Sequence, residues 1–329
     1  MNKNAAFIMI PAAIVALAFP LIVDVPYYVH TLFMFFLFAT MGLAWNLIGG
    51  YGAQLSLGHS AFFAIGAYTA VLLLGDFSIT PWLGGGVGVL LACVAAVIIG
   101  VPCFRLRGPY FTLATIAAAE IIRILLLHFQ EITGGANGIP LPQHSGFFYL
   151  QFSSRTPYYY LSLLLLTVVF LLVRWMGTHK IGRYLAAVRE DQDAAESLGV
   201  RSDRVKLAAF VVSAAVTAVC GVFYAFEIGF IDPDGCAGVD LSVEIAVVVI
   251  VGGIGTLWGP FLGALVVVAL TELTNTFLGS VRSGAGMFLY GLLLMVVVLA
   301  RPAGLISFFH PRKATKPLLE KVNVNVPTP

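Results

Sequence analysis

The sequence of 329 residues is too hydrophobic and too weakly charged for a water-soluble protein. Hydrophobic residues make up 60% of it and charged residues only 10%, whereas a soluble domain carries about 25% charged residues. The 18 basic and 16 acidic residues nearly balance, so no broad basic surface is available for nucleic acid. This composition excludes a cytosolic enzyme, a disordered chain and a nucleic-acid-binding protein. The apolar runs are continuous rather than alternating, which predicts an all-α, polytopic transmembrane helical bundle.

Ten apolar stretches are candidates for membrane spans, since a span needs roughly 20 residues and fewer when it is interrupted. Pro81, Pro109, Pro157 and Pro260 stand where four of these stretches begin, a position that favours the first turn of a helix. We expect one transmembrane domain over residues 1–306, followed by a tail over 307–329. The ten predicted spans are residues 5–23, 28–48, 60–75, 82–104, 109–129, 157–176, 207–228, 243–254, 260–278 and 286–300.

The basic residues predict the orientation of the chain in the membrane. With the N-terminus in the cytoplasm, 15 of the 18 Lys and Arg residues fall in cytoplasmic segments, as the positive-inside rule requires. Both termini are therefore expected in the cytoplasm. Ala16-Leu17-Ala18 is typical of a signal-peptidase site, but the single basic residue before it, Lys3, and the apolar run through Val23 favour a retained first helix.

The sequence contains no nucleotide-binding or catalytic motif. The patterns G-x-x-x-x-G-K-[ST], H-E-x-x-H, C-x-x-C and G-x-S-x-G are all absent, and the four cysteines have no metal-site spacing. We expect no cofactor and no metal on this chain, so any energy must come from a partner or an ion gradient. Gly255, Gly259 and Gly263 are spaced four apart, which predicts one helical face for close packing between membrane helices.

Residues 177–206 form the longest hydrophilic stretch between two predicted spans. The segment 184–198 lacks proline and glycine, which predicts one helix, and Gly199 stands where that helix would end. Leu185, Val188, Ala195 and Leu198 would form its apolar strip. Either this is a solvated loop held inside by its basic residues, or it is an amphipathic helix that docks on a cytoplasmic partner.

Within this loop, Asp193-Ala194-Ala195 followed by Gly199 is similar to the E-A-A-x-x-x-G motif of ABC importer permeases, with Asp in place of Glu. Four longer segments in the same order resemble the permeases of branched-chain amino acid ABC importers of the LivM type. These segments are residues 42–74, 108–140, 181–210 and 249–273.

The resemblance implies a permease subunit in the bacterial inner membrane that moves branched-chain or related hydrophobic amino acids. It further implies a second, LivH-like permease subunit, two cytoplasmic ATPase subunits that bind ATP and magnesium, and a periplasmic substrate-binding protein. In that family the motif forms a coupling helix, which sits in a cleft of the ATPase. The residues that would form it here are Arg189, Glu190, Asp193, Ala194, Ala195, Glu196 and Gly199.

Other functions remain open at this point. Related permeases are associated with urea, amides or aromatic acids, and a secondary transporter driven by an ion gradient would need no ATPase. A membrane enzyme would need a catalytic constellation, and the sequence offers none.

Candidate pathway residues gather where glycines interrupt the apolar pattern, at residues 49–52 and 252–255, because broken membrane helices expose backbone groups that bind charged solutes. The alternative for Gln54, Ser56 and His59 is a cytoplasmic turn with solvated side chains. The full predicted set is Asn46, Gln54, Ser56, His59, Glu120, Arg123, Thr133 and Asn137.

Glu120 and Arg123 lie within the predicted span 109–129, three residues apart and hence on one helical face. A charge near the bilayer centre costs about 2.5–3.5 kcal/mol on insertion scales, so neither side chain should face lipid. They either flank the pathway or form an ion pair that fixes helix packing. Residues 133–138 follow on the outer side, where three glycines permit a tight loop that either contacts substrate or is a plain turn.

Overall fold

The computed structural model describes residues 17–20, 22, 25–106, 108–142, 146–278, 291–292, 295 and 304–308, and these are almost entirely helical. The helices are α2 (Pro26–Asn46), α3 (His59–Phe77), α4 (Pro81–Cys103), α5 (Pro109–His128), α6 (Gln130–Thr133), α7 (Thr156–Thr178), α8 (Lys180–Glu190), α9 (Gln192–Ser197), α10 (Ser202–Ile228), α11 (Pro233–Ala237), α12 (Val239–Gly252) and α13 (Gly259–Leu278).

Short elements join these helices. A π-helical turn, η1 (Leu47–Tyr51), extends α2, and 3-10 turns occur at η2 (Gly135–Asn137), η3 (Phe147–Tyr149) and η4 (Leu305–Phe308). Strands β1 (Ile139–Pro140) and β2 (Phe230–Ile231) pair antiparallel, with Ile139 opposite Ile231.

Seven helical stretches among the described residues are long and apolar enough to cross a membrane. This confirms the all-α membrane class. The eight spans predicted between residues 28 and 278 correspond to α2, α3, α4, α5, α7, α10, α12 and α13, and α4 and α5 begin at Pro81 and Pro109 as expected. The predicted spans 5–23 and 286–300 and the tail 307–329 lie almost wholly outside the described residues. The count of ten spans therefore stays a prediction.

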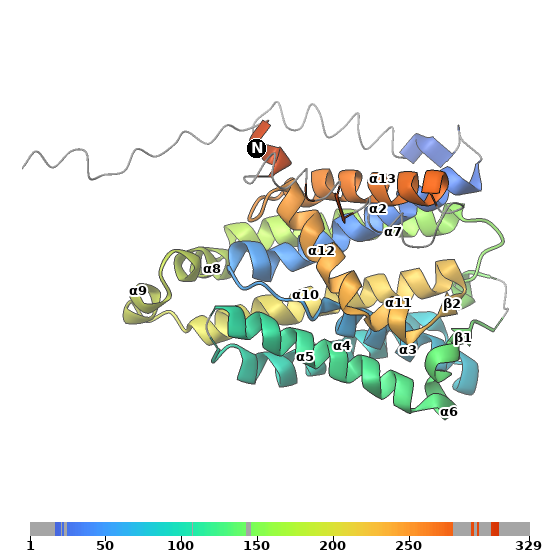
Figure 1. Cartoon of the computed structure of the whole chain (residues 1–329), viewed down its shortest axis with the longest axis horizontal. Helices are drawn as coiled ribbons and strands as arrows, with labels where there is room; N and C mark the ends of the chain where they lie inside the picture. The colour runs from blue at the N-terminus through green and yellow to red at the C-terminus, as the bar shows by residue number, and fades with distance from the viewer. Residues whose placement is uncertain are drawn as a thin grey trace, which may run out of the picture.

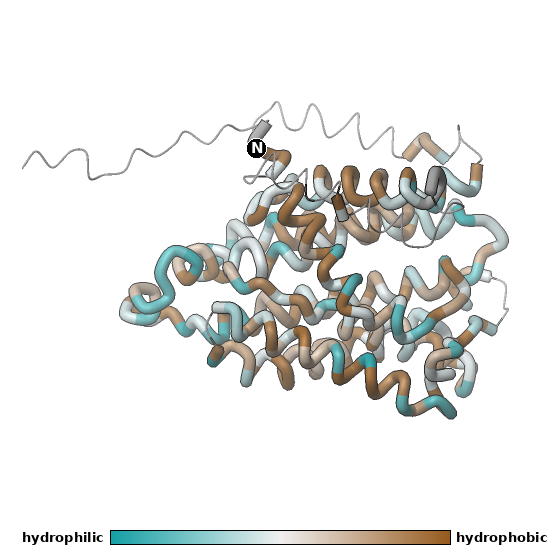
Figure 2. Tube along the Cα trace, in the orientation of Figure 1, coloured by the Kyte–Doolittle hydropathy of each residue, from teal (hydrophilic) through white to brown (hydrophobic). Residues whose placement is uncertain are grey.

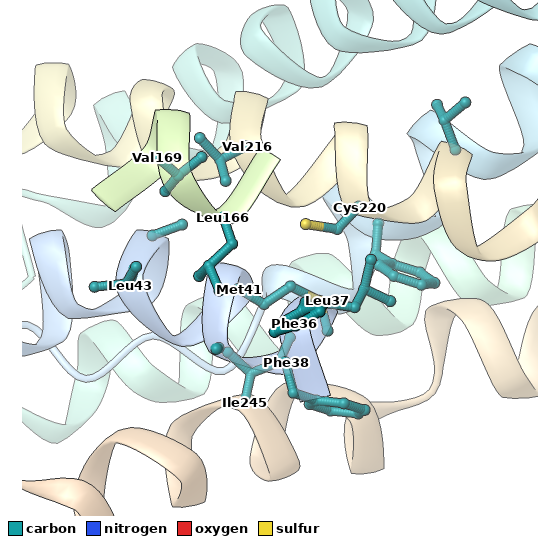
Figure 3. Close-up of a cluster of buried hydrophobic side chains, with 14 of the residues drawn as sticks. Phe36, Leu37, Phe38, Met41, Leu43, Leu166, Val169, Val216, Cys220 and Ile245 are labelled. Carbon is teal, nitrogen blue, oxygen red and sulfur yellow. The ribbon is translucent and has the colours of Figure 1, made fainter. Parts of the chain in front are cut away.

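Helix α2 is the central helix of one part of the bundle, because α7, α10, α12 and α13 all pack against it (Figure 1). Its side chains Phe36, Leu37 and Met41 are buried. Figure 3 shows them beside side chains of other helices, among them Leu166 of α7 and Ile245 of α12. Burial of large apolar side chains against several neighbours stabilises the position of α2 in this part.

Helices α3, α4 and α10 form a second packed group. Their backbones approach closely through small residues: a Cβ atom on Gly66 of α3 would lie 2.1 Å from the carbonyl oxygen of Ala218 in α10. Helix α4 offers a stripe of small residues that the sequence reading overlooked, although its spacing of four was visible. The buried members of this stripe are Gly84, Gly88, Ala92, Ala96 and Gly100.

The polar segments lie at the two ends of the bundle. Helices α8 and α9 lie at one end, and α6 and the β1–β2 pair lie at the other (Figure 1). Figure 2 shows hydrophilic residues gathered around α8 and α9 and hydrophobic residues along the long helices between the ends. We call these ends the α8–α9 end and the opposite end.

Candidate functional site

Helix α2 breaks at the glycine-rich segment that the sequence singled out. Its last turn widens into η1, and Ala53 after it has a left-handed backbone with φ of 51°. Residues 52–58 then run without helical structure into α3. Gly52, Ser56 and Gly58 are buried along this stretch. Irregular backbone inside a membrane is tolerated only within protein or beside water, so this segment must be covered by protein or line an aqueous path.

Side chains from other helices satisfy the backbone of this interrupted segment. Trp45 Nε1 donates to the carbonyl oxygen of Ser56 at 2.7 Å. Thr112 Oγ1 of α5 donates to the carbonyl oxygen of Leu55 at 2.7 Å, and Thr115 Oγ1 accepts from the Leu57 N–H at 3.1 Å. Because buried backbone groups need partners, these bonds fix the path of the segment against α5.

The side chain of Asn46 links the interruption after α2 to a second interruption, the loop between α12 and α13. Its Oδ1 accepts from the Gly255 N–H at 2.8 Å, and its Nδ2 donates to the carbonyl oxygen of Thr256 at 2.8 Å. Its side chain is completely buried. Gly255 lies in the loop between α12 and α13, so a single amide holds together the two helix interruptions that the sequence predicted separately.

His59 and Ser56 are completely buried in this structure. His59 Nε2 and Ser213 Oγ of α10 lie 2.8 Å apart in a hydrogen bond, and the imidazole meets the rings of Phe62 and Phe210 edge-on. His59 Nδ1 and Ser56 Oγ have no partner among the described residues. Gln54 is half-buried, and its side chain remains the most accessible of the three predicted pathway residues in this segment.

Ser60, the residue after His59, also forms hydrogen bonds to another helix. Its N–H donates to Ser242 Oγ of α12 at 2.8 Å, and the two hydroxyl oxygens lie 2.9 Å apart. The first turn of α3 is thereby tied to both α10 and α12. Ser213 and Ser242 were missed from the sequence because single serines within apolar spans carry no spacing signal.

The predicted single helix over 184–198 is wrong. The chain forms α8 and α9, separated at Asp191, whose backbone is extended and whose Oδ1 accepts from the Ala194 N–H at 3.0 Å as the N-cap of α9. A capping aspartate competes with helix continuation, which explains the break. Leu185, Val188 and Ala195 are buried as expected, whereas Leu198 is 87% exposed and does not belong to the apolar strip.

Helix α9 is tied to the start of α10. Lys206 Nζ donates to Gln192 Oε1 at 2.7 Å, and Glu196 accepts hydrogen bonds from Gln192 and Ser202. Helix α10 therefore begins five residues before the predicted span, since its first turns are polar and extend into the loop. Gly199 has φ of +87° and ends the segment where expected. Glu190, Asp193 and Ala194 are exposed.

Arg189 connects this segment to the interrupted helix. Its Nη1 donates to the carbonyl oxygen of Gly50 at 2.9 Å, and a Cβ atom on Gly255 would lie 2.3 Å from the same nitrogen. A Cβ atom on Gly50 would lie 1.9 Å from Asn46 Oδ1. Arg189, Gly50, Asn46 and Gly255 thus form one compact group, here called the break junction.

The three glycines predicted on one helical face do not share a helix. Gly255 lies in the loop with φ of +73°, because the helix begins only at Gly259. Gly259 and Gly263 do lie on α13, and a Cβ atom on Gly263 would be 1.7 Å from the carbonyl oxygen of Val248 in α12. Gly263 therefore permits a close approach of these two helices.

Glu120 and Arg123 form an ion pair on the surface of α5. Arg123 Nε donates to Glu120 Oε2 at 3.0 Å, and its Nη1 donates to Asp234 Oδ1 of α11 at 2.6 Å. The side chains of Arg123 and Glu120 are 26% and 36% exposed. Only Phe111, Thr115 and Ala119 of α5 are buried, so most of this helix has no covering neighbour among the described residues.

Thr133 and Asn137 lie at the opposite end of the bundle. Thr133 Oγ1 donates to the carbonyl oxygen of Phe129, and Gly134, Gly135 and Gly138 all have positive φ angles. Asn137 is exposed. The hydroxyl of Thr133 is thus used within the turn, and the exposed side chain of the two is that of Asn137.

A cavity of about 330 Å³ is lined mainly by α2 and α12, with residues of α3, α10, α11 and α13. Met34, Phe38 and Met41 form an apolar wall, and the acidic residues Asp234, Asp240 and Glu244 line the same space. Such a wall with acidic groups beside it suits a solute with an apolar side chain and an ammonium group. The sequence reading missed Glu244, a single acidic residue near the start of a predicted span.

Comparison with known proteins identifies the family to which the chain belongs. Residues 27–298 match a family described as "Branched-chain amino acid transport system / permease component". The chain belongs to this family. It is a multi-pass permease subunit of an ABC importer, and no solved structure matches it.

Individual relatives cover most of the permease. It is 34% identical to the high-affinity branched-chain amino acid transport system permease protein LivM of Escherichia coli K12, over 85% of this chain and 70% of that protein. It is 24% identical to LivH of the same strain, over 87% of this chain and 93% of that protein. It is also 29% identical to the autoinducer 2 import system permease protein LsrC of Yersinia enterocolitica, over 64% and 61%.

Proposed function

We propose that this permease moves branched-chain or related hydrophobic amino acids into the cell across the bacterial inner membrane. The similarity to LivM supports the substrate class, and so does the cavity that combines an apolar wall with carboxylates. Since LsrC belongs to a different import system by its name, the substrate is the part of this proposal that most needs measurement.

The proposed assembly pairs this chain with a LivH-like permease subunit. The ion pair on α5 supports this, because charges that are one quarter to one third exposed should meet protein or water rather than lipid. Two cytoplasmic ATPase subunits would bind ATP and magnesium, and a periplasmic protein would deliver the substrate. Both termini would lie in the cytoplasm, with the α8–α9 end facing the ATPases.

The break junction is the observation that carries the mechanism. Helix α9 and the residue that follows it expose Asp193, Ala194 and Leu198, while Arg189 of α8 bonds to the interrupted end of α2. A push on α8 would reach Gly50 directly and, through Asn46, the loop that holds Gly255. Closure of the ATPases on ATP would then shift both helix interruptions together and open the path inward.

The test places a bulky charge on the exposed face of α9. Ala194→Arg should abolish co-purification of the ATPase subunits or lower substrate uptake per ATP hydrolysed. Ala136→Arg, at an exposed alanine of η2 at the opposite end, is the control for co-purification alone and should retain the ATPases. If Ala194→Arg keeps ATPase binding at the level of this control and uptake at the level of the unaltered transporter, the proposed coupling surface is wrong.

A further inference from the structure

Helix α5 is the least covered of the seven helical stretches that could cross a membrane, and it lies at the edge of the bundle (Figure 1). Only 17% of its most apolar 18 residues are buried, against 28% for α4. Exposed residues follow one another along α5 at intervals of three or four, so they share one side of the helix. We call this side the α5 face, and it consists of Tyr110, Leu113, Ala117, Ile121 and Ile124.

Lipid alone does not suit the α5 face. Glu120 and Arg123 adjoin it in the second half of the helix, and their side chains are 36% and 26% exposed. Arg123 donates to both Glu120 and Asp234, so one positive charge meets two negative charges and the group keeps a net negative charge. Such a group is costly against hydrocarbon. Helix α4, by contrast, carries no charged residue and exposes Leu90, as expected for a surface in contact with lipid.

The interrupted segment after α2 adjoins the same helix near its beginning. Thr112 Oγ1 of α5 donates to the carbonyl oxygen of Leu55, and Ala53 and Leu55 are exposed. Irregular backbone that is exposed to lipid leaves peptide groups without hydrogen-bond partners. This part of the surface therefore gives a second, independent reason for a covering other than lipid.

Water alone does not suit the α5 face either. Tyr110, Leu113, Ile121 and Ile124 are each more than half exposed, and contact between large apolar side chains and water is unfavourable. Apolar patches of this kind beside polar groups are typical of surfaces that bind other proteins. A protein surface is therefore the covering that suits both the apolar residues and the ion pair.

The covering protein must itself cross the membrane. Helix α5 has 20 residues, so it is about 30 Å long, which is the thickness of the hydrocarbon core. A soluble subunit at either end of the bundle would reach only the first or last turns of such a helix. Only another membrane-spanning chain can follow the α5 face along its length.

We propose that the α5 face, together with residues 53–55, is the surface on which a LivH-like permease subunit packs. The identity of this partner rests on the proposed function, which pairs the two subunits but does not place their interface. A second copy of this chain, lipid and an aqueous path are the other occupants, and each is an outcome of the test below.

The experiment uses single spin labels on the complete transporter in nanodiscs, with the partly exposed Cys93 replaced by alanine. One label is attached through Ala117→Cys on the α5 face, and the control label is attached through Leu90→Cys on α4. Oxygen concentrates in lipid and a nickel chelate stays in water, so their collisions with a label report which of the two surrounds it. We expect the label at residue 117 to lose its collisions with both reagents in the complete transporter, whereas the label at residue 90 stays accessible to oxygen.

A second measurement asks whether the α5 face holds the partner. Ala117→Trp should lower the amount of the LivH-like subunit that co-purifies with this chain about tenfold, because a large side chain overpacks a close contact. Leu90→Trp is the control and should leave the amount unchanged. The label at residue 117 keeps the test valid if Ala117→Trp fails to fold.

Three results would overturn the assignment. Oxygen collisions at residue 117 as frequent as those at residue 90 would mean that lipid covers the α5 face, and frequent collisions with the nickel chelate would mean an aqueous path. Oxidative cross-linking of two Ala117→Cys chains to each other would mean that a second copy occupies it. Leucine uptake by the same preparation separates the claims: uptake with an accessible label at residue 117 rejects only this interface, and no amino-acid uptake rejects the proposed function.

Discussion

Arg189 of α8 donates a hydrogen bond to the carbonyl oxygen of Gly50, 139 residues away in the chain, at 2.9 Å. This bond links the surface segment that resembles a coupling helix to the point where α2 is interrupted. Asn46 extends the link to the α12–α13 loop across 209 residues. A displacement of α8 can therefore act on two interrupted helices at once, which is the simplest way for a partner outside the membrane to move a path within it.

Removing the guanidinium should uncouple the transporter. We expect Arg189→Ala to lower substrate uptake per ATP hydrolysed about tenfold, within the range of typical coupling free energies, while the complex still assembles. Arg189→Lys should recover part of the uptake, since an ammonium group can still donate to the Gly50 carbonyl oxygen. Uptake and ATP hydrolysis are measured together in proteoliposomes.

Arg183→Ala is the control for Arg189→Ala. Arg183 is also exposed on α8, and its guanidinium forms no hydrogen bond within the described part of the chain. The Arg183→Ala variant should keep the ratio of substrate uptake to ATP hydrolysis of the unaltered transporter. If Arg189→Ala and Arg183→Ala have the same ratio of uptake to hydrolysis, the bond to Gly50 transmits nothing.

Asn46 should matter for stability as well as for transport. Asn46→Leu leaves the Gly255 N–H and the Thr256 carbonyl oxygen without their partner, at a cost of about 1–3 kcal/mol for each buried group. We expect a lower temperature of thermal unfolding for the detergent-solubilised subunit. Asn46→Asp keeps the acceptor for Gly255 but sets a buried carboxylate oxygen against the Thr256 carbonyl oxygen, so it should not recover the unfolding temperature of the unaltered chain. An unfolding temperature of Asn46→Leu equal to that of the unaltered chain would contradict this role.

Hydropathy and proline positions predicted most of the helical framework, because a span must be apolar along its length and proline fits the first turn. Eight spans between residues 28 and 278 were placed within a few residues. The break at Asp191 was missed because it lies in a run of good helix formers, where only its capping bond to Ala194 reveals it. Gly255 was misplaced because its spacing matched a helix that starts later.

The site was predictable only in part. The glycines of residues 49–52 and 252–255 marked both interruptions, but their contact through Asn46 is a tertiary relationship that spacing does not encode. Glu227 carried a usable signal, an acidic residue in the last turn of an apolar run, and the sequence reading passed over it. The charged partners of Glu227 are His30 and Arg155, which come from distant parts of the chain, so spacing in the sequence does not reveal them.

Gly263 should not tolerate a methyl group. A Cβ atom there would lie 1.7 Å from the Val248 carbonyl oxygen, so Gly263→Ala must push α13 away from α12. Overpacking of this kind costs about 1–3 kcal/mol. We expect a clear fall in the temperature of thermal unfolding.

Gly86→Ala is the matched control for Gly263→Ala. Gly86 is an exposed helical glycine of α4 with nothing within 4 Å of the added atom. It should keep or raise the unfolding temperature, since alanine favours a helix by about 0.8–1.0 kcal/mol over glycine. Equal effects of the two substitutions would mean that close packing of α12 and α13 is not required.

The α5 ion pair should show strong coupling between its members. Arg123→Gln leaves Glu120 as a partly exposed anion on an apolar helix, while Glu120→Gln leaves Arg123 still paired with Asp234 at 2.6 Å. We therefore expect Arg123→Gln to destabilise the assembled complex more than Glu120→Gln does. The double variant, which carries neither charge, should recover stability relative to Arg123→Gln, with a coupling on the order of 1 kcal/mol. Thermal unfolding of the complex provides this double-mutant cycle. Additive effects would mean that water screens the pair fully, in which case α5 faces an aqueous path rather than a packed protein surface.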